Sequence, residues 1–240
     1  MKILVLIPAR GGSKRLPGKN LRPLGGTPLI AWSINSVKGI ADICDILVST
    51  DDAAIADAAR QAGAQVPWLR PAALATDGAS SVDVCLHALD WYESSHGPVN
   101  CLLLLQPTSP FRRRATIERG LELFWKHGQR PVIGLSPAQS HPMWCFKIEG
   151  EAVLPFIDYD GAPPKSQDLP PAYAINGAFY AIKPADLRKR LSFFGADLVP
   201  LVTDDPAEGI DIDTEIDWRL AEAALDSFES QPSGQQQNKQ

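Results

Sequence analysis

The apolar runs of this chain constrain its fold more than any other feature. Two of them, residues 3–7 and 101–105, read ILVLI and CLLLL, without the alternation that a strand with one wet face would show. A strand that is apolar on both sides is typical of a parallel sheet, because helices cover both faces of such a sheet. We therefore expect an α/β fold with a doubly wound, mostly parallel sheet.

Strands and helices are predicted to alternate along most of the chain. Apolar runs predict strands at residues 2–7, 45–50, 101–105, 131–135 and 177–182. Helical spacing predicts helices at residues 27–38, 52–62, 79–94, 114–127 and 214–228, the third of which could begin at Ala79 or Ser81. In a sheet of this kind, ligands bind beyond the carboxyl ends of the strands.

Two segments depart from this alternation. Residues 140–172 hold many prolines and short β-like pieces, which predicts an arm that leaves the sheet. Trp144 and Phe156 would be poorly covered on a lone hairpin, so a partner subunit is plausible there. Residues 229–240 are polar and low in complexity, which predicts a flexible tail. We expect one domain over residues 1–228.

Composition limits the classes of function. The net charge of −5 argues against a nucleic-acid binder, which usually carries a basic face. No apolar run approaches the roughly 18 residues of a membrane span, and the run at the start is too short for a signal peptide. The four cysteines are scattered and the four histidines lack zinc spacing. We expect a reduced, cytoplasmic protein that binds neither nucleic acid nor membrane.

A basic, glycine-spaced loop follows the first apolar run. Its cations include Arg10, Lys14 and Lys19. Glycines let backbone N–H groups approach an anion, and the cations neutralise its charge. The loop matches neither the P-loop nor the dinucleotide-binding pattern. It is either a solvated surface loop or a triphosphate site, and its place directly after a buried strand in an acidic chain favours the second.

Paired carboxylates lie near the other end of the chain. Asp211 and Asp213 stand two residues apart, so in an extended segment their side chains point the same way. Two such carboxylates can hold Mg²⁺, which prefers oxygen ligands and substrate phosphates. The alternative is that Asp213 or Thr214 caps the closing helix. The two roles are compatible, since Thr214 can cap while the two aspartates face a site.

Two further motifs are weaker. In LQPTSPFR, at residues 105–112, Gln106 and Thr108 follow a strand at the edge where a ligand would lie. A structural turn stiffened by the prolines is the better interpretation of this motif taken alone. In STDD, at residues 49–52, we expect a helix cap with acidic first-turn residues.

Five motifs occur here in one order and resemble those of a known family. They read IPARGGSKRLPGKN, RPAALATDGASSVDV, LQPTSP, NGAFY and DIDTEID. Over about residues 3–225 the chain resembles the CMP-sialic acid synthetases, or acylneuraminate cytidylyltransferases, whose relatives activate legionaminic and pseudaminic acid. The resemblance implies a Rossmann-like fold of the nucleotide-diphospho-sugar transferase type. It also implies a homodimer formed through the inserted arm.

The same resemblance implies a reaction and a set of site residues. CTP and a nine-carbon 2-keto sugar acid would give the CMP-sugar and pyrophosphate with Mg²⁺, in cell-surface polysaccharide biosynthesis. The phosphate cations would be Arg10, Lys14 and Lys19, and the metal ligands Asp211 and Asp213. Nucleotide contacts would be Arg10, Gly11, Asn20, Arg70, Ala79, Ser81 and Thr108. Sugar contacts would be Gln106, Asn176, Tyr180, Phe193 and Phe194, with core packing as the alternative for the two phenylalanines.

Departures from the family pattern leave the sugar open. Where sialic acid members carry basic side chains toward the substrate carboxylate, this chain has Trp144, Ser166 and Ala174, with Lys147 and Lys165 nearby. Two other functions remain as alternatives. One is a nucleotidyltransferase for another acceptor, such as Kdo or a sugar phosphate. The other is a non-catalytic nucleotide-sugar binding protein, for which a metal pair would have little use.

Overall fold

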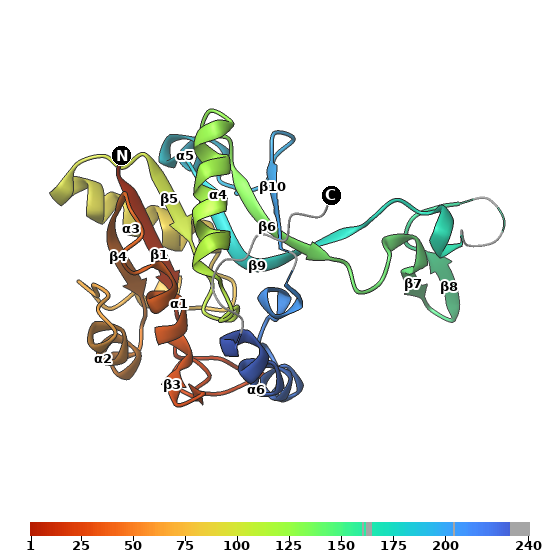
Figure 1. Ribbon diagram of the computed structural model, residues 1–240, viewed down its shortest axis with the longest axis horizontal. Helices are drawn as coiled ribbons and strands as arrows, with labels where there is room; N and C mark the ends of the chain where they lie inside the picture. Colours follow the sequence, from red (N-terminus) through yellow and green to blue (C-terminus); the bar gives the residue numbers. More distant parts are fainter. Residues whose placement is uncertain (160, 162–164, 204, 231–240) are drawn as a thin grey trace.

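A six-stranded mixed sheet forms the centre of the molecule (Figure 1). The computed structural model describes residues 1–159, 161, 165–203 and 205–230. In spatial order the strands are β10 (Val199–Val202), β6 (Val132–Pro137), β9 (Tyr173–Ile182), β5 (Cys101–Leu104), β1 (Ile3–Pro8) and β4 (Ile43–Ser49). Strand β1 runs parallel to β4 and β5, and β10 parallel to β6, whereas β9 is antiparallel to both its neighbours. The prediction of a mostly parallel sheet is confirmed.

Helices cover both faces of this sheet. The helices α1 (Leu29–Val37), α2 (Ala53–Gln61) and α4 (Arg114–Lys126) pack on one face, and α3 (Ser81–His96) and α5 (Pro184–Arg190) on the other. Alternate residues of β1 enter the two cores: Val5 packs with the first set and Leu6 with the second. Both residues are fully buried. This two-sided burial is the physical reason why the apolar runs do not alternate.

A third core fastens the two ends of the chain together. Helix α6 (Glu215–Ser230) packs against the segment after the basic loop, which contains the short paired strands β2 (Pro23–Leu24) and β3 (Thr27–Pro28). Trp218 is fully buried there, and the Arg22 guanidinium lies 4.2 Å from the centre of its ring. The contact holds the end of the basic loop close to residues 211–213, which precede α6.

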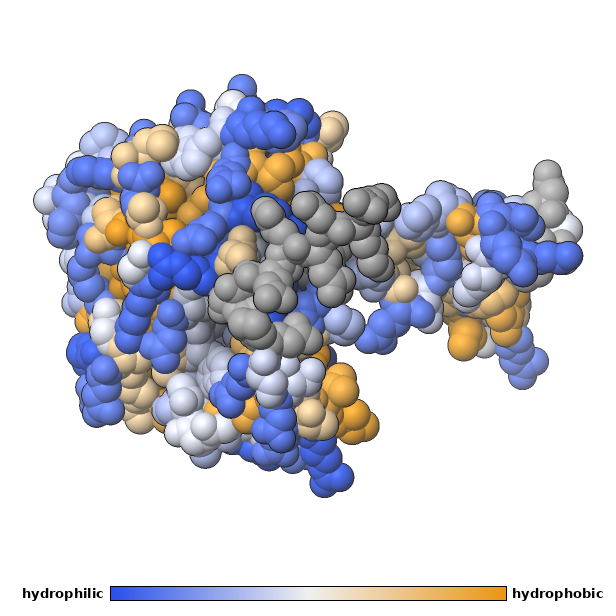
Figure 2. Space-filling model, viewed as in Figure 1, coloured by the Kyte–Doolittle hydropathy of each residue, from blue (hydrophilic) through white to orange (hydrophobic). Residues whose placement is uncertain are grey.

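An arm projects from the body between β6 and β9 (Figures 1 and 2). It carries the antiparallel hairpin of β7 (Phe146–Glu149) and β8 (Ala152–Pro155), within the segment expected to leave the sheet. Apolar side chains on it are exposed, among them Phe146, Ile148, Val153 and Phe156. Figure 2 shows apolar surface near the far end of the arm. Residues 160 and 162–164 of the expected arm lie outside the described residues.

Several boundaries differ from the predictions. Of the two starts predicted for α3, the helix uses Ser81, because the Ser80 side chain caps it by accepting a hydrogen bond from the Asp83 N–H at 3.1 Å. Helix α6 continues to Ser230, so the tail expected from residue 229 begins within a helix, and residues 231–240 lie outside the described residues. The element α5 was not predicted, because only Pro184 and Leu187 of its seven residues are buried and no periodic pattern results.

The short strand β10 was also not predicted. Its four residues include Pro200, and a run of that length gives little periodic signal. Strand β9 begins at Tyr173, four residues before the predicted start, because its first residues run out along the arm, where they are exposed. Among the described residues, no helix combines the length and apolar character needed to span a bilayer.

Candidate active site

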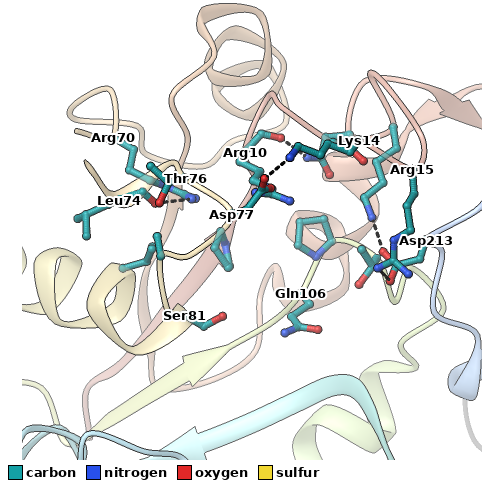
Figure 3. A pocket seen from close by; sticks show the side chains of 18 of the residues that line it. Arg10, Lys14, Arg15, Arg70, Leu74, Thr76, Asp77, Ser81, Gln106 and Asp213 are labelled. Carbon is teal, nitrogen blue, oxygen red and sulfur yellow. Dashed lines mark hydrogen bonds and ion pairs between the residues drawn. The ribbon is translucent and has the colours of Figure 1, made fainter. Parts of the chain in front are cut away.

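A cavity of about 540 Å³ opens at the carboxyl ends of β1 and β5 (Figure 3). Three stretches far apart in the sequence line it: the basic loop after β1, the segment between Arg70 and α3, and residues 106–108 after β5. Asp211 and Asp213 complete the wall. This is the edge at which ligands bind in doubly wound sheets. The predicted nucleotide and phosphate residues in the cavity wall are Arg10, Lys14, Lys19, Asn20, Arg70, Ala79, Ser81 and Thr108.

The aspartates after β4 hold the start of the basic loop. The Gly11 N–H donates to Asp51 Oδ1 at 3.0 Å. A Cβ on Gly11 would come within 2.8 Å of Asp52 Oδ2, so the close approach of this loop requires glycine. Asp52 caps α2 by accepting from the N–H groups of Ala54 and Ile55, which confirms the predicted cap. The predicted acidic first turn is wrong, because the helix begins after both aspartates and its first turn holds no acidic residue. Gly11, predicted to bind nucleotide, is not among the described residues that line the cavity.

Two carboxylates hold the four cations of the basic loop. Asp77 pairs with Arg10 at 2.7 Å and with Lys14. The contacts with Lys14 and Arg10 lower the pKa of Asp77 below its usual value. On the other side, Asp213 pairs with Lys19 at 2.8 Å and with Arg15. These pairs bridge the loop to two different walls of the cavity (Figure 3).

Lys19 is the most deeply placed of these cations. It is only 9 % exposed, and its ammonium also donates to the Ile212 carbonyl at 2.9 Å. A buried ammonium needs such partners, because burial without them disfavours the charged form. Lys19 therefore fixes the position of the 211–213 segment relative to the basic loop.

Asp211 lines the same cavity as Asp213 and contacts the turn after β5. Burial raises the pKa of Asp211, with a smaller contribution from the charge of Asp213, while a hydrogen bond with the Thr108 side chain opposes the shift. The Ile212 N–H donates to the Thr108 carbonyl at 2.7 Å and ties this segment to the turn after β5. The two aspartates therefore share one cavity wall with the predicted nucleotide residues.

The alternative role for this acidic segment is also realised, one residue further on. The Thr214 side chain accepts from the Asp217 N–H at 3.3 Å, and the Asp217 carboxylate accepts from the Thr214 N–H at 2.7 Å. This reciprocal pair caps α6. Thr214 caps the helix while Asp211 and Asp213 remain in the cavity wall, so the two expected roles coexist.

The donor set at Asp211 and Asp213 suits a hard cation. Mg²⁺ is usually held by one or two carboxylates together with substrate phosphates, and these two carboxylates line the cavity together with the cations of the basic loop. Within the described ranges, no group of three or more His, Cys, Asp or Glu side chains could hold a metal without a substrate. The arrangement therefore fits a metal that is completed by the substrate.

Arg70 and Asn20 are the predicted nucleotide residues whose side-chain contacts the structure describes in most detail. Arg70 is buried, with its Nε 3.0 Å from Ser49 Oγ, and burial lowers its pKa. The Asn20 amide donates to the Arg10 carbonyl at 3.0 Å. Its Oδ1 atom is buried and has no hydrogen-bond partner among the described residues. An unpaired buried acceptor is costly, so Asn20 is suited to a donor brought by a ligand.

The predicted sugar residues are divided between the cavity and its surroundings. Gln106 lines the cavity. Asn176 is buried, and its amide donates to Ser136 Oγ at 3.0 Å while its Oδ1 accepts from the Ala178 N–H. In this structure the Asn176 side chain therefore organises the sheet at the base of the arm. Asn176 is not among the described residues that line the cavity.

The aromatic residues predicted on the sugar side form a small cluster. The ring of Tyr180 lies 5.6 Å from that of Phe193 and 6.5 Å from that of Phe194. Tyr180 and Phe193 belong to the core that covers the α3 face, whereas Phe194 is half exposed. None of the three is among the described residues of the cavity wall, so their contact with a sugar stays a prediction.

The sequence analysis did not predict Asp77, Ser13 and Thr76 as lining residues, although each lies inside a motif that it singled out. It also missed Arg112, which ends the LQPTSPFR motif. Arg112 is buried and donates to the Ala178 carbonyl, the Ser33 hydroxyl and the Gln106 carbonyl. Burial lowers its pKa to about 9. It joins the turn after β5 to β9 and α1 from beneath the site.

The chain is similar in sequence to known proteins of one family. A family model described as Cytidylyltransferase matches residues 4–122. CMP-N,N'-diacetyllegionaminic acid synthase of Legionella pneumophila is 40% identical over 94% of this chain and 97% of that protein. Pseudaminic acid cytidylyltransferase of Campylobacter jejuni is 31% identical over 75% of this chain and 78% of that protein. N-acylneuraminate cytidylyltransferase of Streptococcus agalactiae is 34% identical, and the match spans 46% of that longer protein.

Solved structures share the fold at lower identity. A CMP:2-keto-3-deoxy-manno-octonic acid synthetase complexed with CTP aligns with a TM-score of 0.69 over 95% of this chain and 99% of that one, at 17% identity. The 4-diphosphocytidyl-2C-methyl-D-erythritol synthase of Anaerococcus prevotii aligns with a TM-score of 0.64, also at 17% identity, over 94% and 96%. The architecture, the cavity at the strand ends and the sequence similarity over nearly the whole chain agree: this chain belongs to the cytidylyltransferase family.

Proposed function

We propose that this protein transfers CMP from CTP to the anomeric hydroxyl of a nonulosonic acid and releases pyrophosphate. The observation that carries the proposal is the meeting of Lys19 and Asp213 in one cavity, which joins the cationic loop to the carboxylate pair. Similarity to three kinds of nonulosonic acid cytidylyltransferase supports the nature of the acceptor.

The chemistry is an in-line displacement at phosphorus. The anomeric oxygen of the sugar forms a bond to the α-phosphorus of CTP, and the bond from that phosphorus to the bridging oxygen breaks. Pyrophosphate leaves, and one of the two carboxylates takes the proton of the sugar hydroxyl. The protein mainly positions the reactants and neutralises charge.

Each wall of the cavity has a part in this reaction. Arg10, Lys14 and Lys19 line the cavity and would bind the phosphates, and Arg70 with Ala79 and Ser81 would contact the nucleoside. Asp211 and Asp213 would hold Mg²⁺, which supplies further neutralisation of the phosphate charge. Asp213 would then share its oxygens between the metal and its present partners Lys19 and Arg15.

The acceptor that we place first is a diacetylated legionaminic acid. The relative that carries this name is the most similar of the three compared above, and it matches nearly full length. N-acylneuraminic and pseudaminic acid are the next candidates, because relatives that carry those names are also similar to this chain. Kdo stands last, since the CMP-Kdo synthetase shares the fold at only 17% identity. We place the reaction in the cytoplasm, as a step toward cell-surface polysaccharide.

The oligomer that we propose is a homodimer joined through the arm. Ile148 on the hairpin is 75 % exposed and Phe156 is 68 % exposed, so the arm presents apolar surface that folding of one chain leaves uncovered. A second copy of the chain is the partner that the family resemblance implies.

A pyrophosphate-release assay tests the proposed reaction. Release should require CTP, Mg²⁺ and a 2-keto sugar acid together, and omission of any one should abolish it. Acceptors to compare are N,N'-diacetyllegionaminic, pseudaminic and N-acetylneuraminic acid, and Kdo. Absence of release with all four acceptors would refute the proposal. A preference for UTP or GTP over CTP would indicate a different nucleotidyltransferase.

A further inference from the structure

Asp77 lies between two of the cations that the fold presents to a triphosphate (Figure 3). We propose that Asp77 is an internal counter-anion of the basic loop, which a polyphosphate must displace in order to bind. Asp77 is then a specificity-determining residue: it sets how much negative charge a ligand must bring. The identity of the natural ligand as CTP rests on the proposed function.

The contacts of Asp77 occupy both of its carboxylate oxygens. Oδ1 pairs with Arg10 Nη1 at 2.7 Å, and Oδ2 pairs with Lys14 Nζ. A phosphate group offers the same two cations several oxygens of the same kind in place of one carboxylate. Asp77 therefore holds the position and the charge that a phosphate would bring.

Exposure makes this contact replaceable. The side chains of Asp77, Arg10 and Lys14 are 51 %, 37 % and 78 % exposed, so the pair lies where a ligand can reach it. The pair of Lys19 and Asp213 differs, because Lys19 is nearly buried and also donates to a carbonyl. Exposed ion pairs contribute little free energy, so displacement of Asp77 should cost little. Loss of the Lys19 pair should cost more, because Lys19 is nearly buried.

The charges in the cavity wall show why Asp77 affects selectivity. Five cations and three carboxylates are among the described residues that line it. A nucleoside triphosphate carries roughly four negative charges and can compete for the cations that Asp77 holds. A nucleoside without phosphates cannot compete for them. Asp77 thus weakens polyphosphate binding by the cost of its own displacement and leaves nucleoside binding unaffected.

The position of Asp77 in the chain links this exchange to the nucleoside wall. Asp77 lies in the segment between Arg70 and α3, which also contributes Leu74, Thr76 and Ala79 to the cavity. The Asp77 pairs tie this segment to the basic loop. Cytidine binding therefore separates a role of Asp77 in shaping this wall from its role as a counter-anion.

The substitution Asp77→Asn tests the proposal, because asparagine keeps the shape of the side chain and removes its charge. Binding to the full chain is measured by calorimetry for CTP, inorganic tripolyphosphate and cytidine, at fixed Mg²⁺ and without acceptor. We expect Asp77→Asn to lower the Kd for CTP and tripolyphosphate about two- to fivefold, as for loss of an exposed charge pair, and to leave the Kd for cytidine unchanged. The difference should shrink as salt is raised.

Asp57→Asn is the matched control. Asp57 is a surface aspartate paired with Arg60 on α2, outside the cavity, and its side chain is 69 % exposed. This variant should bind all three ligands as the unaltered protein does. Asp77→Ser is a second test variant, which removes the carboxylate with a different side chain and should show the same gain.

Two outcomes overturn the proposal. If Asp77→Asn binds tripolyphosphate no more tightly than the unaltered protein, Asp77 does not compete with phosphate. If cytidine binding changes by the same factor as CTP binding, Asp77 shapes the nucleoside wall and is not a counter-anion. The result with tripolyphosphate is independent of the base, so a failed preference for CTP would refute the proposed function and leave the role of Asp77 standing.

Discussion

At the scale of single residues, charge pairing across the cavity is the central feature. Lys19 and Asp213 stand 194 positions apart in the chain and 2.8 Å apart in the structure. The sequence alone identified Lys19 as a candidate cation and Asp213 as a candidate carboxylate of the site. Which carboxylate meets which cation depends on long-range packing, so the sequence suggested neither this pair nor the pairs of Asp77.

Asp213→Asn is expected to reduce turnover by about 10²–10³, the usual cost of losing one electrostatic group at a reacting centre. The variant removes a proposed metal ligand and leaves the nearly buried Lys19 with the Ile212 carbonyl as its acceptor. Steady-state pyrophosphate release over a Mg²⁺ titration measures the effect, with Asp57→Asn as the surface control. Normal turnover and normal Mg²⁺ dependence in Asp213→Asn would exclude Asp213 as a ligand.

Arg112→Met is expected to destabilise the fold by about 3 kcal/mol or more, because it leaves buried acceptors without their donor. The acceptors are the carbonyls of Ala178 and Gln106 and the Ser33 hydroxyl. Urea unfolding measures the loss. Arg188→Met, which breaks partly exposed ion pairs with Asp90 and Glu93, should cost much less. Equal losses in the two variants would contradict the role given to Arg112.

At the scale of elements, loops that leave one edge of the sheet make the site. The loops after β1, β4 and β5 meet because those three strands are parallel and end at the same edge. This could be predicted from the order of apolar runs and motifs. The helix caps at Asp52 and Thr214 could also be predicted, since capping is decided by residues two or three positions apart. The position of residues 211–213 in the cavity wall could not be predicted in this way, because it depends on the packing of α6 against the segment after the basic loop.

Glu208 provides an element-scale test by pH. It precedes α6 in the short helix Pro206–Gly209, and its carboxylate accepts from the Arg113 N–H and Thr116 Oγ1 at the start of α4. Burial raises the pKa of Glu208 above its ordinary 4.5. An acid with a raised folded-state pKa costs stability as it ionises, so its contribution falls as pH rises from 4.5 through the raised value and then levels off.

Glu208→Gln should remove this pH dependence. The unfolding free energy of the unaltered protein, relative to that of Glu208→Gln, should decrease as pH rises above 4.5. Urea unfolding at a series of pH values between about 4 and 7 measures the difference. An increase over the same range would mean that the helix terminus and hydrogen bonds outweigh burial at this carboxylate.

At the scale of the whole molecule, the arm is the part whose apolar side chains the chain itself does not cover. Its hairpin projects away from the body and exposes apolar side chains (Figures 1 and 2). Light scattering after size-exclusion chromatography should give a dimer for the unaltered protein. The double variant Ile148→Asp and Phe156→Asp should give a monomer, since charges placed in an apolar interface are strongly unfavourable.

Ile216→Asp is the control for this experiment. Ile216 is 79 % exposed on α6, on the body of the molecule, so its replacement tests added charge without touching the arm. It should remain a dimer. A double arm variant that also remains a dimer, or an unaltered protein that is a monomer at micromolar concentration, would contradict the proposed assembly.

The sequence by itself determined the fold class, the family and the edge of the sheet where the site lies. The fold class and the edge of the sheet follow from two-sided apolar strands, glycine-spaced cations and paired carboxylates, each of which has a local signature. The family follows from the resemblance of five ordered motifs to those of a known family. Only the tertiary structure decided the pairing of Asp77 with Arg10 and Lys14, the burial of Lys19 and the place of Asn176 in the sheet. Those depend on contacts between segments far apart in the chain, whose distances and burial no local pattern encodes.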